Sequence, residues 1–280
     1  MSAGASRAGV AGAVPVTAIV PCYRCAATVH RAVASITAQV SPPAQVVLVD
    51  DCSGDGTLDA LREVQRGLGK DRVTIVTLSQ NRGAGGARNA GWNVASGEYV
   101  AFLDADDTWH PRKLQIQYAF MRARPEVVLS GHAHARIAES EPLDRPLAKS
   151  GHRMISFTQL LLSNRFVTPS AMVKRDVAHR FLEGARHMED HLLWLEIAAD
   201  GSPVARLDET LAFLYKAPFG ASGLSANLMD MEKAELGNYR RLKERGAIGA
   251  TAMCALQSYS IAKFMRRLLV ARIRPVNPES

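Results

Sequence analysis

The fold of this chain is decided by residues 97–107, which read Gly97-Glu98-Tyr99-Val100-Ala101-Phe102-Leu103-Asp104-Ala105-Asp106-Asp107. The run from Tyr99 to Leu103 is apolar, as in a strand that is covered on both faces. Residues two apart in an extended chain point the same way, so we expect Asp104 and Asp106 to project together at the carboxyl end of this strand. Oxygen ligands there suit Mg²⁺ or Mn²⁺, held by one or two carboxylates and by substrate phosphates. An isolated Asp-x-Asp pattern is more often a solvated loop whose aspartates cap a helix. Whether this one binds a metal ion therefore has to be judged from the other motifs of the chain.

Strand and helix signals alternate around this acidic segment. Apolar runs typical of buried strands occupy residues 16–20, 45–49 and 73–78. Helical patterns follow over 26–40, over 57–68, after a glycine-rich loop expected at 81–86, and over 111–124. This order favours a mostly parallel α/β sheet with helices on both faces. Such sheets bind ligands beyond the carboxyl ends of their strands.

Composition narrows the class of protein. With 280 residues, 47% of them hydrophobic, the chain can form one large domain with an appendage. Its formal net charge of +7 suits an anionic partner, which can be a nucleotide, a phospholipid or a nucleic acid. The four cysteines do not form a recognisable disulfide framework, and no second Cys or His pair supports a zinc site. Cys22 and Cys25 have the spacing of a redox pair, but without a matching signature we interpret it as coincidence.

The sequence predicts three parts. Residues 1–15 are small and unpatterned, which indicates a disordered tail and not a signal peptide, and no apolar run is long enough to span a membrane. Residues 16–225 are the main domain, with a less regular second half that includes a helix over 189–199 and strands over 170–173 and 211–215. Residues 226–280 are a helical extension, interrupted at 246–249. A soluble cytoplasmic protein is expected, or one that lies peripherally at the cytoplasmic face of the membrane.

Four sequence blocks together carry a family resemblance. In chain order they read TAIVPCYRCAATVHRAVASITAQ, VVLVDDCSGDGT, NRGAGGARNAGWNVASGEYVAFLDADDTWHPRKL and MEDHLLWLEIAADG. With these blocks the chain resembles the family 2 glycosyltransferases, which are inverting enzymes with the GT-A fold. The resemblance implies a nucleotide-diphosphate sugar as donor, Mg²⁺ or Mn²⁺ as cofactor, and a glycan or lipid-linked acceptor. It also implies a role in the synthesis of a cell-surface or exported polysaccharide.

The resemblance assigns the donor site to the ends of the first strands. A tyrosine ring can stack on a nucleotide base, a carboxylate can accept a hydrogen bond from a base N–H, and a guanidinium suits phosphate. The residues at the matching positions for nucleotide-sugar binding are Pro21, Tyr23, Asp51, Arg88 and Asp104. Asp106, together with Asp104, matches the metal ligands, and Asp107 is either a supporting residue or a helix cap.

The resemblance also places a catalytic base. Asp190, in the acidic pair that it forms with Glu189, matches the carboxylate that takes the proton of the acceptor hydroxyl in inverting transfer. A helix N-terminus favours the ionised form of such a carboxylate. The chain departs from the family at Arg24, where asparagine is common, and after Tyr215, where Lys216 stands without the family's histidine. Residues 217–225 are then a candidate lid.

The end of the chain allows two interpretations. Ile261, Phe264, Met265, Leu268 and Leu269 form an apolar stripe within 261–273, with basic residues beside it. This suits an amphipathic helix that lies on an anionic membrane, or equally a helix that packs on protein. Two other functions stay open: a nucleotidyltransferase, although the basic glycine-rich loop that it needs after the first strand is missing, and an inactive relative that binds glycan or acts as a scaffold. Nucleic-acid binding is not expected, because the basic residues form no patch interleaved with aromatic residues.

Overall fold

A computed structural model describes residues 12–147, 150–215 and 228–273 of the protein. The chain divides into two compact units, unit 1 with residues 1–216 and unit 2 with residues 217–280. Residues 1–11 of the predicted tail, and the predicted domain boundary at 225/226, lie outside the described residues. The first strand already begins at Val14.

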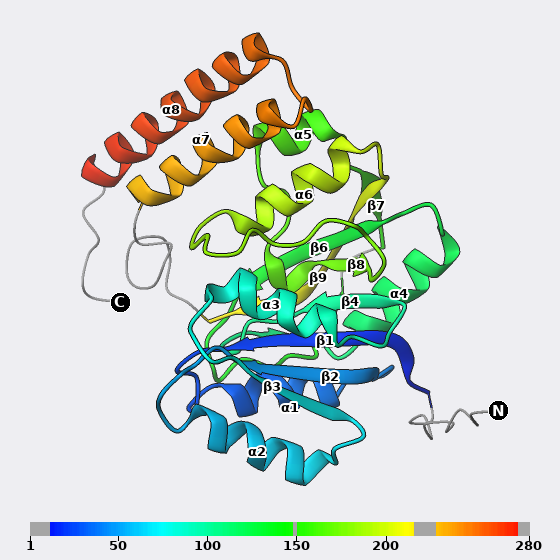
Figure 1. Ribbon diagram of the computed structural model, residues 1–280. Helices are drawn as coiled ribbons and strands as arrows, with labels where there is room; N and C mark the ends of the chain where they lie inside the picture. Colours follow the sequence, from blue (N-terminus) through cyan, green and yellow to red (C-terminus); the bar gives the residue numbers. More distant parts are fainter. Residues whose placement is uncertain (1–11, 148–149, 216–227, 274–280) are drawn as a thin grey trace, which may run out of the picture. The chain divides into compact units, whose positions relative to one another are not determined.

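The first half of unit 1 alternates strands and helices (Figure 1). Its elements are β1 (Val14–Cys22), α1 (Val29–Thr37), β2 (Pro43–Asp50), α2 (Thr57–Leu68), β3 (Val73–Thr77), α3 (Gly83–Asn93) and β4 (Tyr99–Phe102). The glycine-rich segment that was predicted as a loop is the first turn of α3. Gly83 begins that helix with a φ of +73°, a value that glycine adopts without strain.

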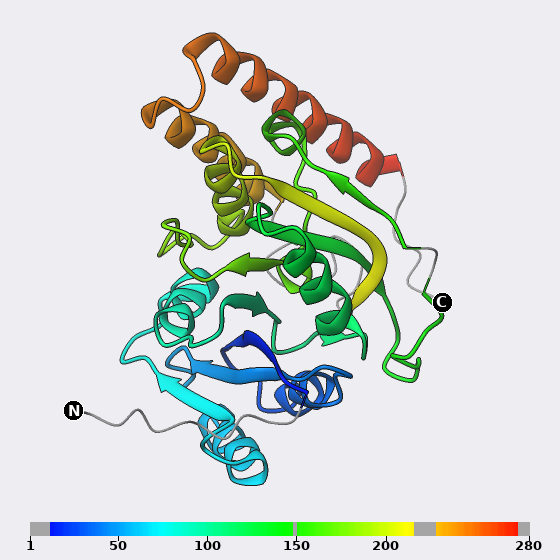
Figure 2. The same cartoon turned by 90° about the vertical axis from the view of Figure 1, so that its right-hand side faces the viewer.

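The second half of unit 1 is less regular and extends the same sheet. Its elements are β5 (Thr108–Trp109), α4 (Lys113–Ala123), β6 (Leu129–Arg136), β7 (His152–Met154), α5 (Phe157–Leu162), the 3₁₀ helix η1 (Thr168–Ser170), β8 (Met172–Lys174), α6 (Glu189–Ala199) and β9 (Val204–Leu214). Figure 2 shows β9 as a long curved strand.

The sheet is mostly parallel. Within the described residues it has nine strands in the order β3-β2-β1-β4-β8-β6-β9-β5, with β7 paired to β9. The first four strands in this order are parallel to one another. β8 is antiparallel to both of its neighbours, which leaves β6 and β9 parallel to the first four strands. Since only β5, β7 and β8 run the other way, six of these nine strands share one direction, and the predicted fold class is confirmed.

Alternate residues of each strand face opposite layers of helices. Ala18 and Val20 of β1 belong to a core cluster that includes residues of α1, α2 and α4. Ile19, between them, faces α3 on the other side of the sheet. A Cβ atom on Gly91 of α3 would lie 2.6 Å from Ile19 Cγ2 and 3.1 Å from Val49 Cγ2. The missing side chain at position 91 therefore lets α3 lie directly on β1 and β2, and the helix begins at the carboxyl edge of the sheet, where β3 ends.

The described residues of unit 2 form two helices, α7 (Leu228–Glu244) and α8 (Ala250–Ile273), which pack against each other. Gly246, with a φ of +75°, allows the reversal between them. Lys263 of α8 forms an ion pair of 3.1 Å with Glu235 of α7. Among the described residues, neither these nor the other helices combine the length and hydropathy needed to cross a bilayer.

Candidate active site

The three aspartates that follow β4 lie in a turn. The Asp107 N–H donates to the Asp104 carbonyl at 3.1 Å, which closes the turn directly after the strand. The segment is therefore not extended as expected, and whether Asp104 and Asp106 project together stays a prediction. The chain has to reverse here, because the next strand, β5, runs antiparallel to β9. Asp107 is buried, whereas Asp104 and Asp106 are partly exposed, so these two carboxylates can be reached by a ligand.

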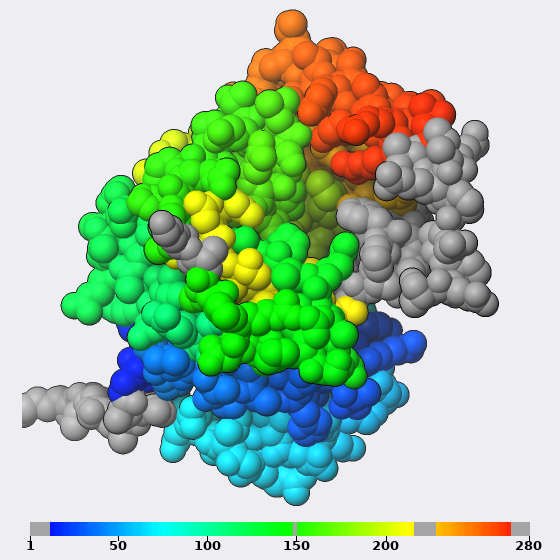
Figure 3. Space-filling view, turned by 180° about the vertical axis from the view of Figure 1, so that it is seen from behind, coloured from blue at the N-terminus to red at the C-terminus, as the bar shows by residue number. Residues whose placement is uncertain are grey.

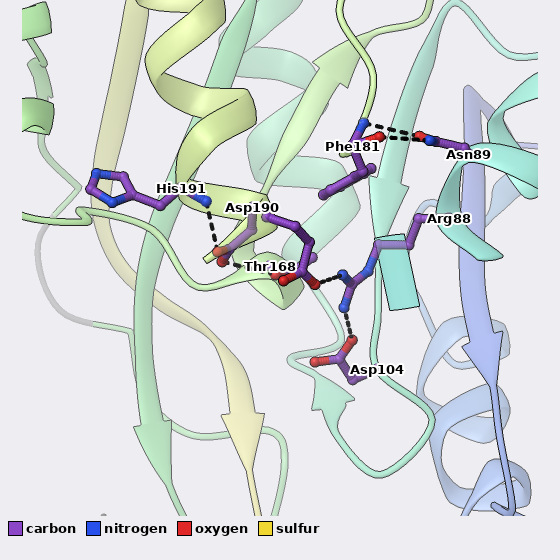
Figure 4. A network of polar contacts seen from close by, with 8 residues as sticks. Arg88, Asn89, Asp104, Thr168, Phe181, Asp190 and His191 are labelled. Carbon is purple, nitrogen blue, oxygen red and sulfur yellow. Dashed lines mark hydrogen bonds and ion pairs between the residues drawn. The ribbon is translucent and has the colours of Figure 1, made fainter. Parts of the chain in front are cut away.

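Arg88 of α3 connects this acidic turn to α6 (Figure 4). Its Nη2 donates to Asp104 Oδ1 at 2.7 Å, and its Nη1 donates to Glu189 Oε1 at 3.1 Å. The Arg88 side chain is only 5% exposed. Burial by itself lowers the pKa of Arg88, but the negative charges of Asp104 and Glu189 outweigh it, and the pKa is raised. The guanidinium is thus a charged bridge between two acidic segments, and breaking such a buried pair is strongly destabilising.

Asp190 lies at the start of α6, beside Glu189. One of its oxygens, Oδ2, accepts a hydrogen bond from the Thr168 hydroxyl at 3.1 Å, and the other, Oδ1, accepts from the His191 N–H at 2.7 Å (Figure 4). Burial raises the pKa of Asp190 and that of Glu189, and the charge of Arg88 opposes the rise in both. An ionised carboxylate whose pKa is raised is a better proton acceptor. The geometry therefore suits general-base chemistry at Asp190.

A second set of contacts fixes α3 against the segment before α6. Asn89 Nδ2 donates to the Phe181 carbonyl at 2.8 Å, and the Phe181 N–H donates to Asn89 Oδ1 at 3.0 Å. The Phe181 ring lies 5.3 Å from the Arg88 guanidinium carbon. The sequence reasoning did not identify Asn89, Phe181 or Thr168 as site residues. Asn89 could have been identified, because it directly follows Arg88 in the same motif. Nothing in the sequence pattern marks Thr168.

Asp51 and Tyr23 lie at the ends of β2 and β1. The Asp51 N–H donates to the Cys22 carbonyl at 2.9 Å, and Asp51 Oδ1 accepts from the Arg82 N–H at 2.7 Å. Asp51 is buried, and this burial raises the pKa of its carboxyl group. Tyr23, in contrast, is 47% exposed, and the guanidinium carbon of Arg24 lies 5.2 Å from the centre of its ring.

The predicted donor residues share one edge of the sheet. Tyr23, Asp51 and Asp104 follow β1, β2 and β4, which are neighbouring parallel strands whose carboxyl ends coincide, and Pro21 is the second-last residue of β1. A cleft of about 360 Å³ adjoins Asp51 and is lined by residues 80–83, 183, 184 and 186. Lys216 and the candidate lid at 217–225 lie outside the described residues.

The donor set of the acidic turn fits a hard divalent cation. Asp104 and Asp106 offer partly exposed carboxylate oxygens, the ligand type that Mg²⁺ and Mn²⁺ prefer. In the parts of the chain that the structure describes, no three His, Cys, Asp or Glu side chains converge as a complete metal cage. Mg²⁺ commonly binds through one or two carboxylates together with substrate phosphates and water.

An α/β sheet whose carboxyl edge carries these groups is typical of enzymes that transfer sugars from nucleotides. Residues 17–182, more than half of the chain, match the sequence profile of Glycosyl transferase family 2. The chain belongs to this family and is a glycosyltransferase.

Relatives and solved structures agree with this assignment. The chain is 30% identical over 199 residues to TuaG of Bacillus subtilis, which is named for teichuronic acid biosynthesis, and the match covers 70% of this chain and 77% of TuaG. It is 27% identical over 187 residues to WfgD of Escherichia coli, a UDP-Glc:α-D-GlcNAc-diphosphoundecaprenol β-1,3-glucosyltransferase, covering 67% of this chain and 71% of WfgD. The fold resembles that of the mannosyltransferase PcManGT from Pyrobaculum calidifontis in complex with GDP-Man and Mn²⁺, with a TM-score of 0.66, 19% identity, and coverage of 95% and 77%. The fold is therefore GT-A.

Proposed function

We propose that this glycosyltransferase is an inverting, metal-dependent enzyme that transfers a sugar from a nucleotide-diphosphate sugar to a hydroxyl of a lipid-linked glycan. The observation that carries the proposal is the Arg88 bridge, with 2.7 Å to Asp104 of the acidic turn and 3.1 Å to Glu189 beside Asp190. It ties Asp104, which would contact the donor, to Glu189, the chain neighbour of Asp190, which would activate the acceptor. Direct displacement needs both groups on opposite sides of one sugar ring.

Asp190 takes the role of general base in this proposal. The acceptor oxygen attacks the anomeric carbon, the bond from that carbon to the diphosphate oxygen breaks, and the hydroxyl proton passes to Asp190. The Thr168 hydroxyl and the His191 N–H hold the carboxylate in place. Glu189 is occupied by Arg88 at 3.1 Å, which makes it the weaker candidate for the base.

The donor would lie along the carboxyl edge of the sheet. Tyr23 would stack on the base, with Pro21 shaping the wall beside it, and Asp51 would accept a hydrogen bond from a base N–H. Asp104 would contact the ribose, and Arg88 would orient Asp104 more than it would touch phosphate, because its guanidinium is buried. Asp106, together with Asp104, would hold Mg²⁺ or Mn²⁺. Such an ion, when bound, neutralises the charge that develops on the departing diphosphate.

The acceptor class is inferred from relatives and from α8. WfgD is named for a diphosphoundecaprenol acceptor and TuaG for teichuronic acid synthesis, which supports a lipid-linked precursor of a cell-surface polysaccharide here. On α8, Ile261, Met265 and Leu269 are four residues apart and 47%, 52% and 56% exposed. An exposed apolar stripe beside Arg266 and Arg267 suits peripheral contact with an anionic membrane at its cytoplasmic face.

The experiment is a donor panel with a ligand variant. Release of nucleoside diphosphate and donor binding are measured for UDP- and GDP-sugars, with Mn²⁺ or with EDTA. Asp106→Ala should abolish metal-dependent donor binding, and the variant should stay folded, because Asp106 lies in a partly exposed turn outside the apolar core. Asp71→Ala, at an exposed aspartate outside the site, is the matched control. Unchanged metal dependence in Asp106→Ala would remove Asp106 from the ligand set.

A further inference from the structure

Arg31 of α1 contacts three segments that are far apart in the sequence. Its Nη2 donates to the backbone carbonyl of Asp106 at 2.9 Å. Its Nη1 forms an ion pair with Glu139, in the segment after β6. Its guanidinium carbon lies 3.9 Å from the centre of the Tyr215 ring, directly after β9. One side chain thus joins the acidic turn to two later parts of the chain.

A further hydrogen bond closes these contacts into a ring. The Tyr215 hydroxyl lies 3.2 Å from Thr108 Oγ1, two residues after Asp106. The acidic turn is therefore held at Asp106 by Arg31 and at Thr108 by Tyr215, and the Arg31–Tyr215 stack joins the two holding residues. We call Arg31, Thr108, Glu139 and Tyr215 the clasp. Figure 3 shows the segment after β6, in green, lying against the blue amino-terminal part of the molecule that includes α1.

The contributions of these contacts are unequal. Glu139 is 76% exposed, so its ion pair with Arg31 adds little stability. The Arg31 side chain is 27% exposed, and its stack on Tyr215 and its hydrogen bond to Asp106 are better shielded. The acidic turn is also held by the Asp107–Asp104 backbone hydrogen bond and by Arg88 at Asp104. Among these contacts, the one from Arg31 is made to the Asp106 backbone carbonyl.

The backbone position of Asp106 matters for the binding of a metal ion. Asp104 and Asp106 are the partly exposed carboxylates of the turn. The coordination geometry of a bound ion would therefore depend on the backbone position of these two residues. Mg²⁺ demands near-ideal octahedral geometry, and residues that orient metal ligands are worth roughly 10–100-fold in affinity. By holding the Asp106 backbone carbonyl, the Arg31 guanidinium also restricts the position from which the Asp106 side chain extends.

We propose that Arg31 is a positioning residue of the metal and donor-diphosphate site, acting on Asp106 through the clasp. This rests on the proposed function, since the ion and the donor belong to it. Arg31 itself touches neither substrate nor ion. Its effect is on the affinity for the divalent cation in the presence of nucleoside diphosphate, and not on metal-free nucleotide binding.

The test compares clasp variants with a matched arginine. Arg31→Met removes both the planar guanidinium with its hydrogen-bond donors and the positive charge, whereas Arg31→Lys keeps the charge alone. Tyr215→Phe keeps the aromatic ring but loses the hydrogen bond to Thr108. Arg62→Met removes an exposed arginine of α2 that pairs with Asp59 at 3.0 Å. Mn²⁺ binding is measured by electron paramagnetic resonance with UDP or GDP present, nucleotide binding by calorimetry in EDTA, and folding by thermal melts.

Arg31→Met should weaken Mn²⁺ binding roughly 10–100-fold. Arg31→Lys should not restore it, Tyr215→Phe should show a smaller loss in the same direction, and Arg62→Met should show none. Nucleotide affinity in EDTA should stay unchanged in all four variants.

A lowered melting temperature with wild-type Mn²⁺ affinity would make Arg31 merely structural and overturn the proposal. A loss of metal-free nucleotide binding would overturn it too, because Arg31 would then contact the nucleotide. If the unaltered protein turns over donor without binding Mn²⁺, the metal dependence in the proposed function fails as well, and this distinguishes the two failures.

Discussion

The hydrogen bond from Thr168 to Asp190 allows a quantitative prediction for the variant Thr168→Val. Valine has nearly the shape of threonine but cannot donate to Asp190 Oδ2, the oxygen that the hydroxyl approaches at 3.1 Å. A hydrogen bond to a charged group contributes about 1.5–3 kcal/mol, and because Asp190 is only partly buried we take the lower end, about 1.5 kcal/mol. One pKa unit corresponds to about 1.4 kcal/mol, so the pKa of Asp190 should rise by about one further unit.

The sign follows from which form the bond favours. The Thr168 hydroxyl stabilises the ionised carboxylate and lowers the pKa of Asp190, while burial raises it. Removing the hydroxyl raises the pKa further, so a higher pH is needed to ionise the base. The acid limb of the kcat profile should then move to higher pH by about one unit, and kcat on that limb should fall about tenfold. At pH values well above the limb, kcat should approach that of the unaltered enzyme.

The assay is nucleoside diphosphate release across pH at saturating donor and acceptor. Ser170→Ala is the matched control, because its hydroxyl belongs to the same short helix but donates to the Val167 carbonyl at 2.7 Å. Thr168→Ser should restore the profile. An acid limb that does not move in Thr168→Val, in a variant with normal melting temperature, would show that Asp190 does not titrate in the rate-determining step, and Glu189 would replace it as the candidate base.

Three further predictions concern the base, the sheet and α8. Asp190→Asn should reduce turnover by roughly two orders of magnitude or more with donor affinity unchanged, in kinetic and calorimetric assays. Its melting temperature at neutral pH should not fall, because a raised carboxyl pKa means that ionisation destabilises the folded state as pH rises through that pKa. Gly91→Ala should lower the free energy of unfolding by about 1–3 kcal/mol in urea titrations, since the new methyl group would meet Ile19 at 2.6 Å; an unchanged midpoint would mean that α3 can move away from the sheet. The double change Ile261→Ser and Met265→Ser should release the protein from anionic vesicles in co-sedimentation, and salt should do the same, whereas an unaltered protein that never sediments with vesicles would exclude the membrane interpretation.

The sequence predicts the first half of the fold well because its signals there are local. The helix over 57–68 and the apolar strands β1 to β4 follow from periodicity and turn residues, and their shared direction follows from the alternation of strands and helices. β5 has two residues, too few for any period, and β6 was missed because its LSGHAHAR pattern is apolar only in part. These strands depend on pairing with β9, which lies about 70 residues or more further along the chain, and no local window contains that information.

The site divides in the same way. The position of Asp104 and Asp106 after a strand indicates a cation site, and the family resemblance assigns roles to Arg88 and Asp190; all of these roles stay predictions. The turn that orients the aspartates was not predicted, because the sequence of this segment is compatible with both an extended chain and a turn. Thr168 is set against Asp190 by tertiary structure, since η1 packs on β4, β6 and β9, and no spacing in the sequence connects the two residues.

The position of β8 has a consequence for synthesis on the ribosome. β4 is paired on one side with β1, which is made before it, and on the other side with β8, which begins at Met172. From Phe102 to Met172 is 70 residues, or roughly 4–14 s of translation at 5–20 residues per second. During that interval the apolar strand YVAF has one free edge in the growing chain, which is the kind of edge that pairs with other chains. A chaperone that binds short extended apolar segments would have its best opportunity in this interval, and slow codons between 103 and 172 would lengthen it.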